Sequence, residues 1–249
     1  MPFLLFLYVK FIAGSECWGG MSGRALTNWF PMIQLALPGL VMVEAECLAF
    51  EILTLAASYL GTDKLAAQSV LGTISSITFQ IPFPLSIASS TRIANLIGSS
   101  RVDCAKICAH VSFMLAVIAG AFNVILLSSL RYTLPRLFSS DEQVIYLVAQ
   151  VLPLCAAFQL FDALAANCNG LLRGLGRQSV GGWVQLLCYY MVAMPISFGT
   201  TFGLNWGLHG LWSGVAIALG LVSLIEGIFL QRTNWLSAVQ DAIQRNSLA

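Results

Sequence analysis

The sequence predicts an all-α integral membrane protein, a bundle of six transmembrane helices, and its composition and charge pattern support this fold class. Of the 249 residues, 58% are hydrophobic and 9% are charged, whereas soluble domains carry about 25% charged residues. Four long stretches contain no Asp, Glu, Lys or Arg: 65–91, 107–130, 143–161 and 178–225. A spanning helix needs about 20 mainly apolar residues, and these stretches supply them.

The spans follow in order along the chain. The first, 31–60, is apolar apart from three glutamates in the stretch EAECLAFE. The 48 residues of the last uncharged stretch hold two spans, because GLNWG at 203–207 supplies the glycines and asparagine of a tight turn. The six predicted spans are 31–60, 65–92, 106–130, 143–170, 179–203 and 208–231.

The basic residues predict that both flanks of the bundle are cytoplasmic. Eight basic residues fall in one set of loops (Arg24, Arg92, Arg101, Lys106, Arg173, Arg177, Arg232 and Arg245) and three in the other (Lys64, Arg131 and Arg136). Cytoplasmic loops carry an excess of Lys and Arg. The larger set therefore marks the cytoplasmic side.

Several functional classes lack support in the sequence. A net charge of +1 without a basic run argues against nucleic-acid binding. The seven scattered cysteines form no CxxC, and Cys104, Cys108 and His110 make a poor metal site. GLLRGLGRQ lacks a P-loop ending, and no nucleophile has a nearby base. We therefore expect no enzyme, catalytic residue, cofactor or metal.

The three glutamates of the first span suggest a cavity, because an ionised side chain at mid-bilayer costs about 2.5–3.5 kcal/mol. At about 100° per residue, Glu44 and Glu51 share a helix face, and Glu46 lies about 140° from Glu51. One straight helix cannot direct all three to one narrow site. Glu44 has the alternative of a place near the membrane interface. Pro38, before Glu44, can kink this helix.

Two further acids lie in apolar surroundings. Asp162 follows Gln159 by three residues and precedes Asn167 and Asn169, a polar stripe among small residues that is typical of a cavity lining. Glu226 is close to the cytoplasmic end of its span, where a long side chain can reach water. We expect Glu226 to do so, and Glu226→Gln to leave transport largely unaffected.

Prolines are expected to make the backbone of the bundle irregular. Pro82 and Pro84 fall in the second span, and Pro153 and Pro195 in two later ones. Irregular backbone at membrane depth occurs where it lines a protein-enclosed pathway.

Four stretches, in order, resemble the eukaryotic branch of the multidrug and toxin extrusion (MATE) family: WFPMIQLALPGLVMVEAECLAFEILTLAASYLG, QIPFPLSIASSTRIANLIG, GLLRGLGRQSVGGWVQLLCYYMVAMPISF and GLHGLWSGVAIALG. The resemblance runs from about Trp18 to Trp235. It implies the C-terminal lobe, helices seven to twelve, of a twelve-helix fold with two pseudo-symmetric lobes. Domains are then 1–30, a remnant of helix six and a cytoplasmic linker; 31–235, the six-helix lobe; and 236–249, a short cytoplasmic tail.

The resemblance also assigns roles to residues. The family's Glu-aromatic-aromatic-small-aromatic-Glu pattern falls on Glu46 to Glu51, although Cys47 and Leu48 replace the aromatic pair. The helix-ten acid falls on Asp162, with Gln159 one turn earlier. These residues, with Asn167, are the predicted proton- and cation-coupling site and substrate cavity. The motif that matches Ser90, Thr91, Arg92, Ile93 and Asn95 is expected to be structural.

The function this implies is secondary antiport, by a whole or half transporter that exports organic cations or xenobiotics against protons rather than sodium. Its expected partners are a small organic cation, the lipid bilayer, and an N-terminal six-helix lobe or a second copy. Its expected location is the plasma or vacuolar membrane. One alternative is an inactive lobe that acts only through contacts with membrane proteins. Another is a lipid or oligosaccharide flippase, which would need several cationic side chains in its cavity.

Overall fold

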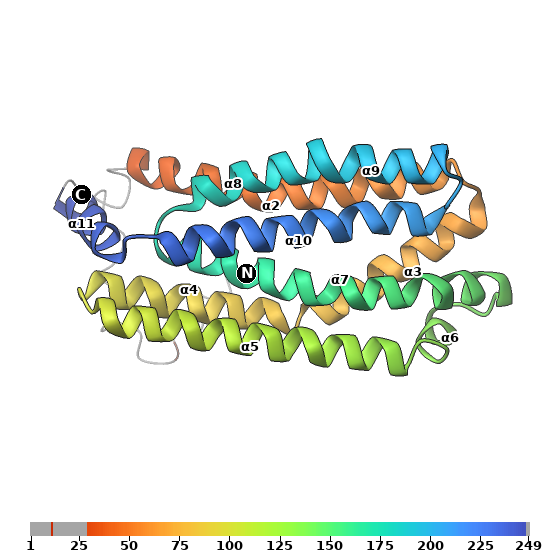
Figure 1. Cartoon of the computed structure of the whole chain (residues 1–249), viewed down its shortest axis with the longest axis horizontal. Coiled ribbons are helices and arrows are strands. Elements are labelled where there is room, and N and C mark those ends of the chain that lie inside the picture. Colours follow the sequence, from red (N-terminus) through yellow and green to blue (C-terminus); the bar gives the residue numbers. More distant parts are fainter. Residues whose placement is uncertain (1–10, 12–28, 248–249) are drawn as a thin grey trace. The chain divides into compact units, whose positions relative to one another are not determined.

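The computed structural model describes residue 11 and residues 29–247, and every regular element in these ranges is a helix. The chain divides into two units, residues 1–34 and residues 35–249. The arrangement of helices given below is that of the second unit (Figure 1). The predicted helix remnant and linker lie outside the described residues, apart from Phe11, Trp29 and Phe30.

The helices match the predicted spans closely. Helix α2 (Trp29–Ser58) occupies the first span, and α3 (Thr62–Phe79) and α4 (Pro82–Gly98) together form the second. Helices α5 (Val102–Ser129), α7 (Glu142–Gly174) and α10 (Leu208–Arg232) form the third, fourth and sixth, and the short α6 (Leu134–Phe138) precedes α7. Helix α11 (Trp235–Ser247) lies in the predicted tail.

The fifth span changes helix type along its length. It runs through α8 (Gln178–Leu186), the π-helical η3 (Leu187–Ala193), α9 (Met194–Phe198) and the π-helical η4 (Gly199–Gly203). Pro195, which cannot donate a helical hydrogen bond, stands just after η3. The predicted irregularity is therefore present here, whereas α7 continues unbroken through Pro153.

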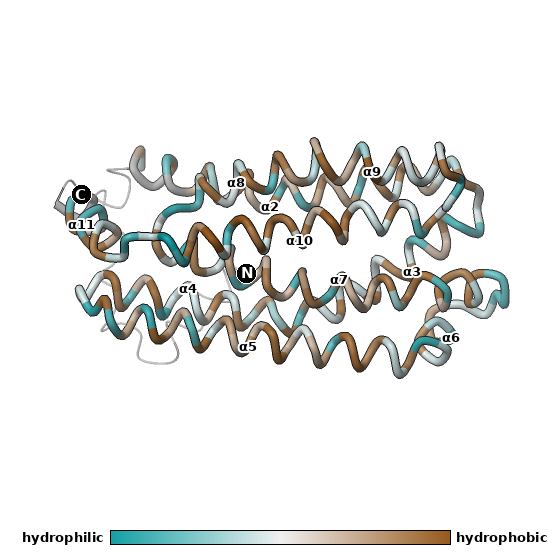
Figure 2. The backbone as a smooth tube through the Cα atoms, in the orientation of Figure 1, coloured by the Kyte–Doolittle hydropathy of each residue, from teal (hydrophilic) through white to brown (hydrophobic). Residues whose placement is uncertain are grey.

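Five helical runs within the described residues are long and apolar enough to cross a membrane: Thr62–Gly98, Val102–Ser129, Glu142–Gly174, Gln178–Gly203 and Leu208–Arg232. Helix α2, which occupies the first predicted span, has 30 residues and is not among these five runs. Large apolar side chains are exposed along α5, including Met114, Ile118, Phe122 and Ile125. Figure 2 shows apolar residues along the helices and hydrophilic ones concentrated near the turns, a distribution that suits a lipid surrounding.

The second span breaks at Gln80 and Ile81 because Pro82 has no backbone N–H to donate to the Thr78 carbonyl. Asn123 of α5 compensates, since its Nδ2 donates to the Thr78 carbonyl at 3.1 Å. The same Nδ2 lies 3.3 Å from Oε1 of Gln159 on α7. The side chains of Asn123 and Gln159 are fully buried. The Thr78 carbonyl therefore accepts from Asn123 as well as from the Ile81 amide, at 3.2 Å, and Gln159 accepts from the same Asn123 amide group.

Helix α7 is the central element of the unit, and it packs against α3, α4, α5 and α10. One apolar cluster joins α2, α3, α7 and α10 and includes Leu71, Phe158 and Trp212. A second joins α4, α5, α7 and α11 around Ile93 and Leu171. The second cluster fixes the tail helix α11 to the bundle, so residues 235–247 continue the fold as an ordered helix.

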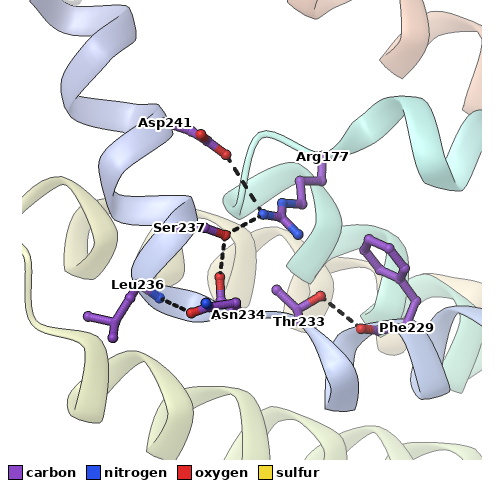
Figure 3. A network of polar contacts seen from close by, with 7 residues as sticks. All are labelled: Arg177, Phe229, Thr233, Asn234, Leu236, Ser237 and Asp241. Atoms are coloured by element: carbon purple, nitrogen blue, oxygen red, sulfur yellow. Dashed lines mark hydrogen bonds and ion pairs between the residues drawn. The ribbon is translucent and has the colours of Figure 1, made fainter.

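Polar contacts at one end of the bundle also hold α11 (Figure 3). Arg177, in the turn between α7 and α8, donates from Nη2 to Ser237 Oγ at 2.8 Å and forms an ion pair with Asp241 at 3.7 Å. Asn234 Oδ1 accepts from the Leu236 amide at 3.1 Å and so caps the start of α11. The α7–α8 turn and α11 therefore lie at the same end, the end predicted to be cytoplasmic.

The other end contains the α2–α3 turn and the turn between η4 and α10. Asn205 and Gly207 have positive φ values of 57° and 56°, which confirms the turn predicted from GLNWG. A Cβ atom on Gly207 would lie 3.6 Å from Nζ of Lys64, near the start of α3. Both turns therefore face the same side.

We expect cysteines placed at Thr62 and Asn205, both exposed, to react with impermeant reagents added outside intact cells. A cysteine at Ser100, in the exposed α4–α5 turn, should react only from the cytosol. The measurement is labelling in a background without native cysteines. Labelling of Thr62→Cys or Asn205→Cys from the cytosol alone would overturn this topology.

Glycines on α10 allow a close approach to the fifth span. A Cβ on Gly214 would meet Ser197 Oγ and would lie 2.7 Å from the Ala193 carbonyl oxygen. Gly210, one turn earlier, faces Thr201 in the same way. Small residues four apart are typical of tightly packed transmembrane helices.

Gly214→Ala is expected to destabilise the bundle by about 1–3 kcal/mol, the usual cost of overpacking. Gly227→Ala is the matched control, because Gly227 lies on the same helix and a Cβ there meets nothing within 4 Å. Thermal unfolding of both variants, each in a complete two-lobe transporter in detergent, measures the difference. Equal midpoints would show that the α10 contact tolerates a methyl group.

Candidate functional site

A cavity of about 420 Å³ lies between α2, α3, α4 and α7, and Gln185 of α8 also lines it. Its polar side chains come from all five helices, so no single stretch of sequence contains the site. Cys47, Glu51 and Ser76 line the cavity and are exposed. The cavity therefore opens at the surface of the lobe.

Helix α2 contributes Glu46 and Glu51 to this cavity. The helical-wheel expectation paired Glu44 with Glu51, but Glu44 is exposed and lies outside the lining. The lining takes in a broad face of α2 from Met42 to Thr54. A wide cavity can thus receive two carboxylates about 140° apart on the wheel.

Helix α7 contributes one continuous stripe at helical spacing, with Phe158, Asp162, Ala165 and Ala166, Asn169, and Arg173. Asp162 is only 5% exposed, and its carboxylate lies within electrostatic reach of Glu46. The two alanines leave room beside Asp162. The structure therefore brings together three of the predicted site residues, Glu46, Glu51 and Asp162.

Gln159 and Asn167 lie outside this lining. Gln159 points toward α5, where it contacts Asn123 at the proline break. Asn167 is 3% exposed, and its Nδ2 has no hydrogen-bond partner among the described residues. Both side chains are buried between α7 and its neighbouring helices. Because α7 packs against helices on several sides, only part of its polar stripe faces the cavity.

Two aromatic rings of the lining pack against a buried tryptophan. Phe50 and Phe158 line the cavity, and each packs edge-on against Trp212 of α10, with centroids 6.1 Å and 5.5 Å away. Trp212 Nε1 donates to Gln68 Oε1 at 2.8 Å. Gln68, on α3, also lines the cavity. Sequence reasoning missed Gln68, although a glutamine within an uncharged span is a signal that could have indicated it.

The lining also contains a basic group that the sequence placed in a loop. Arg173 lines the cavity and donates from Nη2 to Ser86 Oγ of α4 at 3.2 Å. Ser86 Oγ in turn donates to the Ala166 carbonyl at 2.5 Å. A Cβ on Gly170 would lie 2.5 Å from the Ser86 carbonyl oxygen, so only glycine allows this approach of α4.

Three lining side chains hold oxygens without a hydrogen-bond partner in the described parts of the chain: Ser75, Asn169 and Gln185. An amide or hydroxyl oxygen can accept a hydrogen bond from a substrate. These oxygens add neutral acceptors to the three carboxylates. The cavity is therefore suited to a ligand with N–H donors or positive charge.

The structure contradicts the expectation for Glu226. Its side chain is 0% exposed and reaches no water. Helix α10 continues for six residues beyond Glu226, and the helices around it cover that side chain. The expectation that Glu226→Gln leaves transport unaffected assumed that Glu226 reaches water, and this assumption is wrong.

The sequence profile of the family described as MatE matches residues 38–198, more than half of the chain. The chain belongs to the MatE family. An uncharacterized transporter of Saccharomyces cerevisiae is 41% identical over 235 residues, which cover 94% of this chain and 34% of that protein. Human multidrug and toxin extrusion protein 1 is 36% identical, with 97% of this chain and 43% of that protein covered.

The fold of this MatE protein matches a solved relative. The crystal structure of the eukaryotic MATE transporter AtDTX14 aligns with a TM-score of 0.93 at 27% identity, covering 98% of this chain and 55% of that one. The chain spans about half the length of these relatives or less. The family resemblance, the fold class and the multi-pass membrane location are thereby confirmed, and the family is one of transporters.

Proposed function

We propose that this MatE lobe forms one wall of a pathway that exports small organic cations or xenobiotics in exchange for protons. The observation that carries the proposal is the cavity itself, which is lined by three acids from two helices, Glu46, Glu51 and Asp162, and by a single guanidinium, Arg173. The acidic excess favours a positively charged ligand. The aromatic wall of Phe50 and Phe158 favours one with apolar groups.

Competition between proton and substrate would provide the coupling. Desolvation disfavours the charged form of a carboxyl group, and an arriving cation favours it. A proton and a cation therefore compete for a carboxylate in such a cavity, because binding of either one disfavours binding of the other. Rocking of one lobe against the other would then expose the site alternately to the two sides of the membrane.

A proton is the proposed coupling ion, in preference to sodium. A pair such as Glu46 and Asp162, placed within electrostatic reach of each other, can share a proton, since two neighbouring negative charges disfavour each other.

The flippase alternative is less well supported by the cavity. Phosphate groups of a lipid or oligosaccharide carrier would need several cationic side chains, and Arg173 is the single lysine or arginine in the described lining. A lobe without transport activity, acting through membrane-protein contacts, remains the other candidate.

Efflux from vesicles with an imposed pH gradient tests the proposal. The protein would be a complete two-lobe transporter that contains this lobe, and the probe a fluorescent organic cation. We expect efflux that stops when the gradient is collapsed by a protonophore. Efflux indifferent to the gradient would contradict proton exchange, and no cation movement at all would favour the inactive lobe.

A further inference from the structure

Glu226 is the most deeply buried carboxylate among the described residues, with 0% exposure against 5% for Asp162. Neither of its oxygens has a hydrogen-bond partner within the described ranges. The one ion pair found there, between Arg177 and Asp241, does not involve it. An ionised carboxylate is strongly disfavoured in an apolar interior without a partner. The packing around Glu226 therefore accommodates the neutral, protonated acid.

The surroundings of Glu226 come from three other elements. Cys168 of α7 and Cys188 and Tyr189 of η3 lie within its electrostatic reach, as does Glu46 of α2. Cys168 Sγ contacts the Ser223 carbonyl at 3.9 Å, one turn before Glu226, which places this thiol against the same part of α10. These thiols and the phenol are weak acids and provide no positive charge.

Tyr189 relates this buried acid to the cavity. The Tyr189 side chain lies within electrostatic reach of Glu46, Asp162 and Glu226. Glu226 itself is outside the cavity lining. The π-helical turn that carries Tyr189 is of a kind often found at functional sites. One fully buried phenol therefore stands close to all three acids.

We propose that Glu226 is a proton-binding residue behind the cavity whose proton is controlled by the charge on Glu46. A negative Glu46 helps to retain the proton on Glu226, because two nearby negative charges repel each other. A cation bound against Glu46 offsets that charge and favours release of the proton. The inference rests on the proposed function and deepens it. A cation bound at Glu46 would displace a proton from Glu226 without contacting Glu226.

Infrared spectroscopy of a purified two-lobe transporter that contains this lobe tests the first part without any transport. At neutral pH we expect a high-frequency carbonyl band from a protonated carboxyl group without hydrogen bonds. Glu226→Gln should remove that band. Glu142→Gln, an exposed carboxylate at the start of α7, should leave it unchanged. A band that survives in Glu226→Gln would overturn the proposal.

A pH titration of the same band tests control by Glu46. In Glu46→Gln, we expect the band to disappear at a lower pH than in the wild type, because a negative charge that retained the proton is gone. This variant keeps Glu226, so the result stands even if Glu226→Gln fails to fold. An unchanged midpoint would overturn the coupling.

The two proposals fail in different ways. If the infrared results hold while the vesicle assay shows no exchange, the proton site stands and the proposed transport function is wrong. If efflux depends on the pH gradient while the Glu226 band is absent, the transport function stands and Glu226 is an ordinary buried residue.

Discussion

Asp162→Asn is expected to reduce proton-driven cation efflux by about tenfold or more. Coupling free energies between two ligands are typically about 1–3 kcal/mol, which corresponds to about 5- to 150-fold. Asparagine keeps the size of the side chain but can neither bind a proton nor carry the charge that attracts a cation. Asp162 is nearly buried and lines the cavity close to Glu46. The measurement is efflux from vesicles with an imposed pH gradient, in a complete two-lobe transporter.

Two variants on α2 complete this test. Glu51→Gln should lower efflux in the same way, because Glu51 also lines the cavity. Glu44→Gln is the matched control, since Glu44 lies seven residues away on the same helix but is exposed outside the lining. Wild-type efflux in Asp162→Asn would show that this carboxyl group is not required for coupling.

The second large effect concerns the 249-residue chain by itself, which we expect to show no gradient-dependent transport in proteoliposomes. Its acidic cavity opens at the surface of the lobe, where Glu51 and Ser76 are exposed. Against lipid, each ionised group at mid-bilayer costs about 2.5–3.5 kcal/mol unless it is neutralised or paired. Such a face requires an opposite wall, so the purified chain should be unstable or aggregate.

Co-expression with a matching N-terminal lobe is the corresponding rescue, and it should restore efflux. The Asp162→Asn form of this chain, co-expressed in the same way, is the control for carry-over of another transporter. Robust uptake by the chain alone, with mass measurement that shows a defined homodimer, would contradict this expectation. In that case a second copy of the chain would supply the missing wall.

The membrane class and the spans could be predicted from the sequence because the hydropathy of a segment depends only on its consecutive residues. The predicted span 208–231 matches Leu208–Arg232, and 106–130 matches Val102–Ser129 within a few residues. The turn at 203–207 was also predictable, since glycine and asparagine favour the positive φ values found there. Acids are conspicuous in an apolar span, and the roles predicted for Glu46, Glu51 and Asp162 came from the family resemblance.

The neighbours of each polar side chain were decided only by the tertiary structure. Gln159 accepts a hydrogen bond from Asn123, 36 residues earlier in the chain, and lies outside the cavity lining. Arg173 reaches the cavity from the end of α7, because glycine at 170 lets α4 approach. Glu226 is buried although it lies near the end of its span. Hydropathy indicates how deep a residue lies along a helix, whereas packing between distant helices decides what its side chain faces.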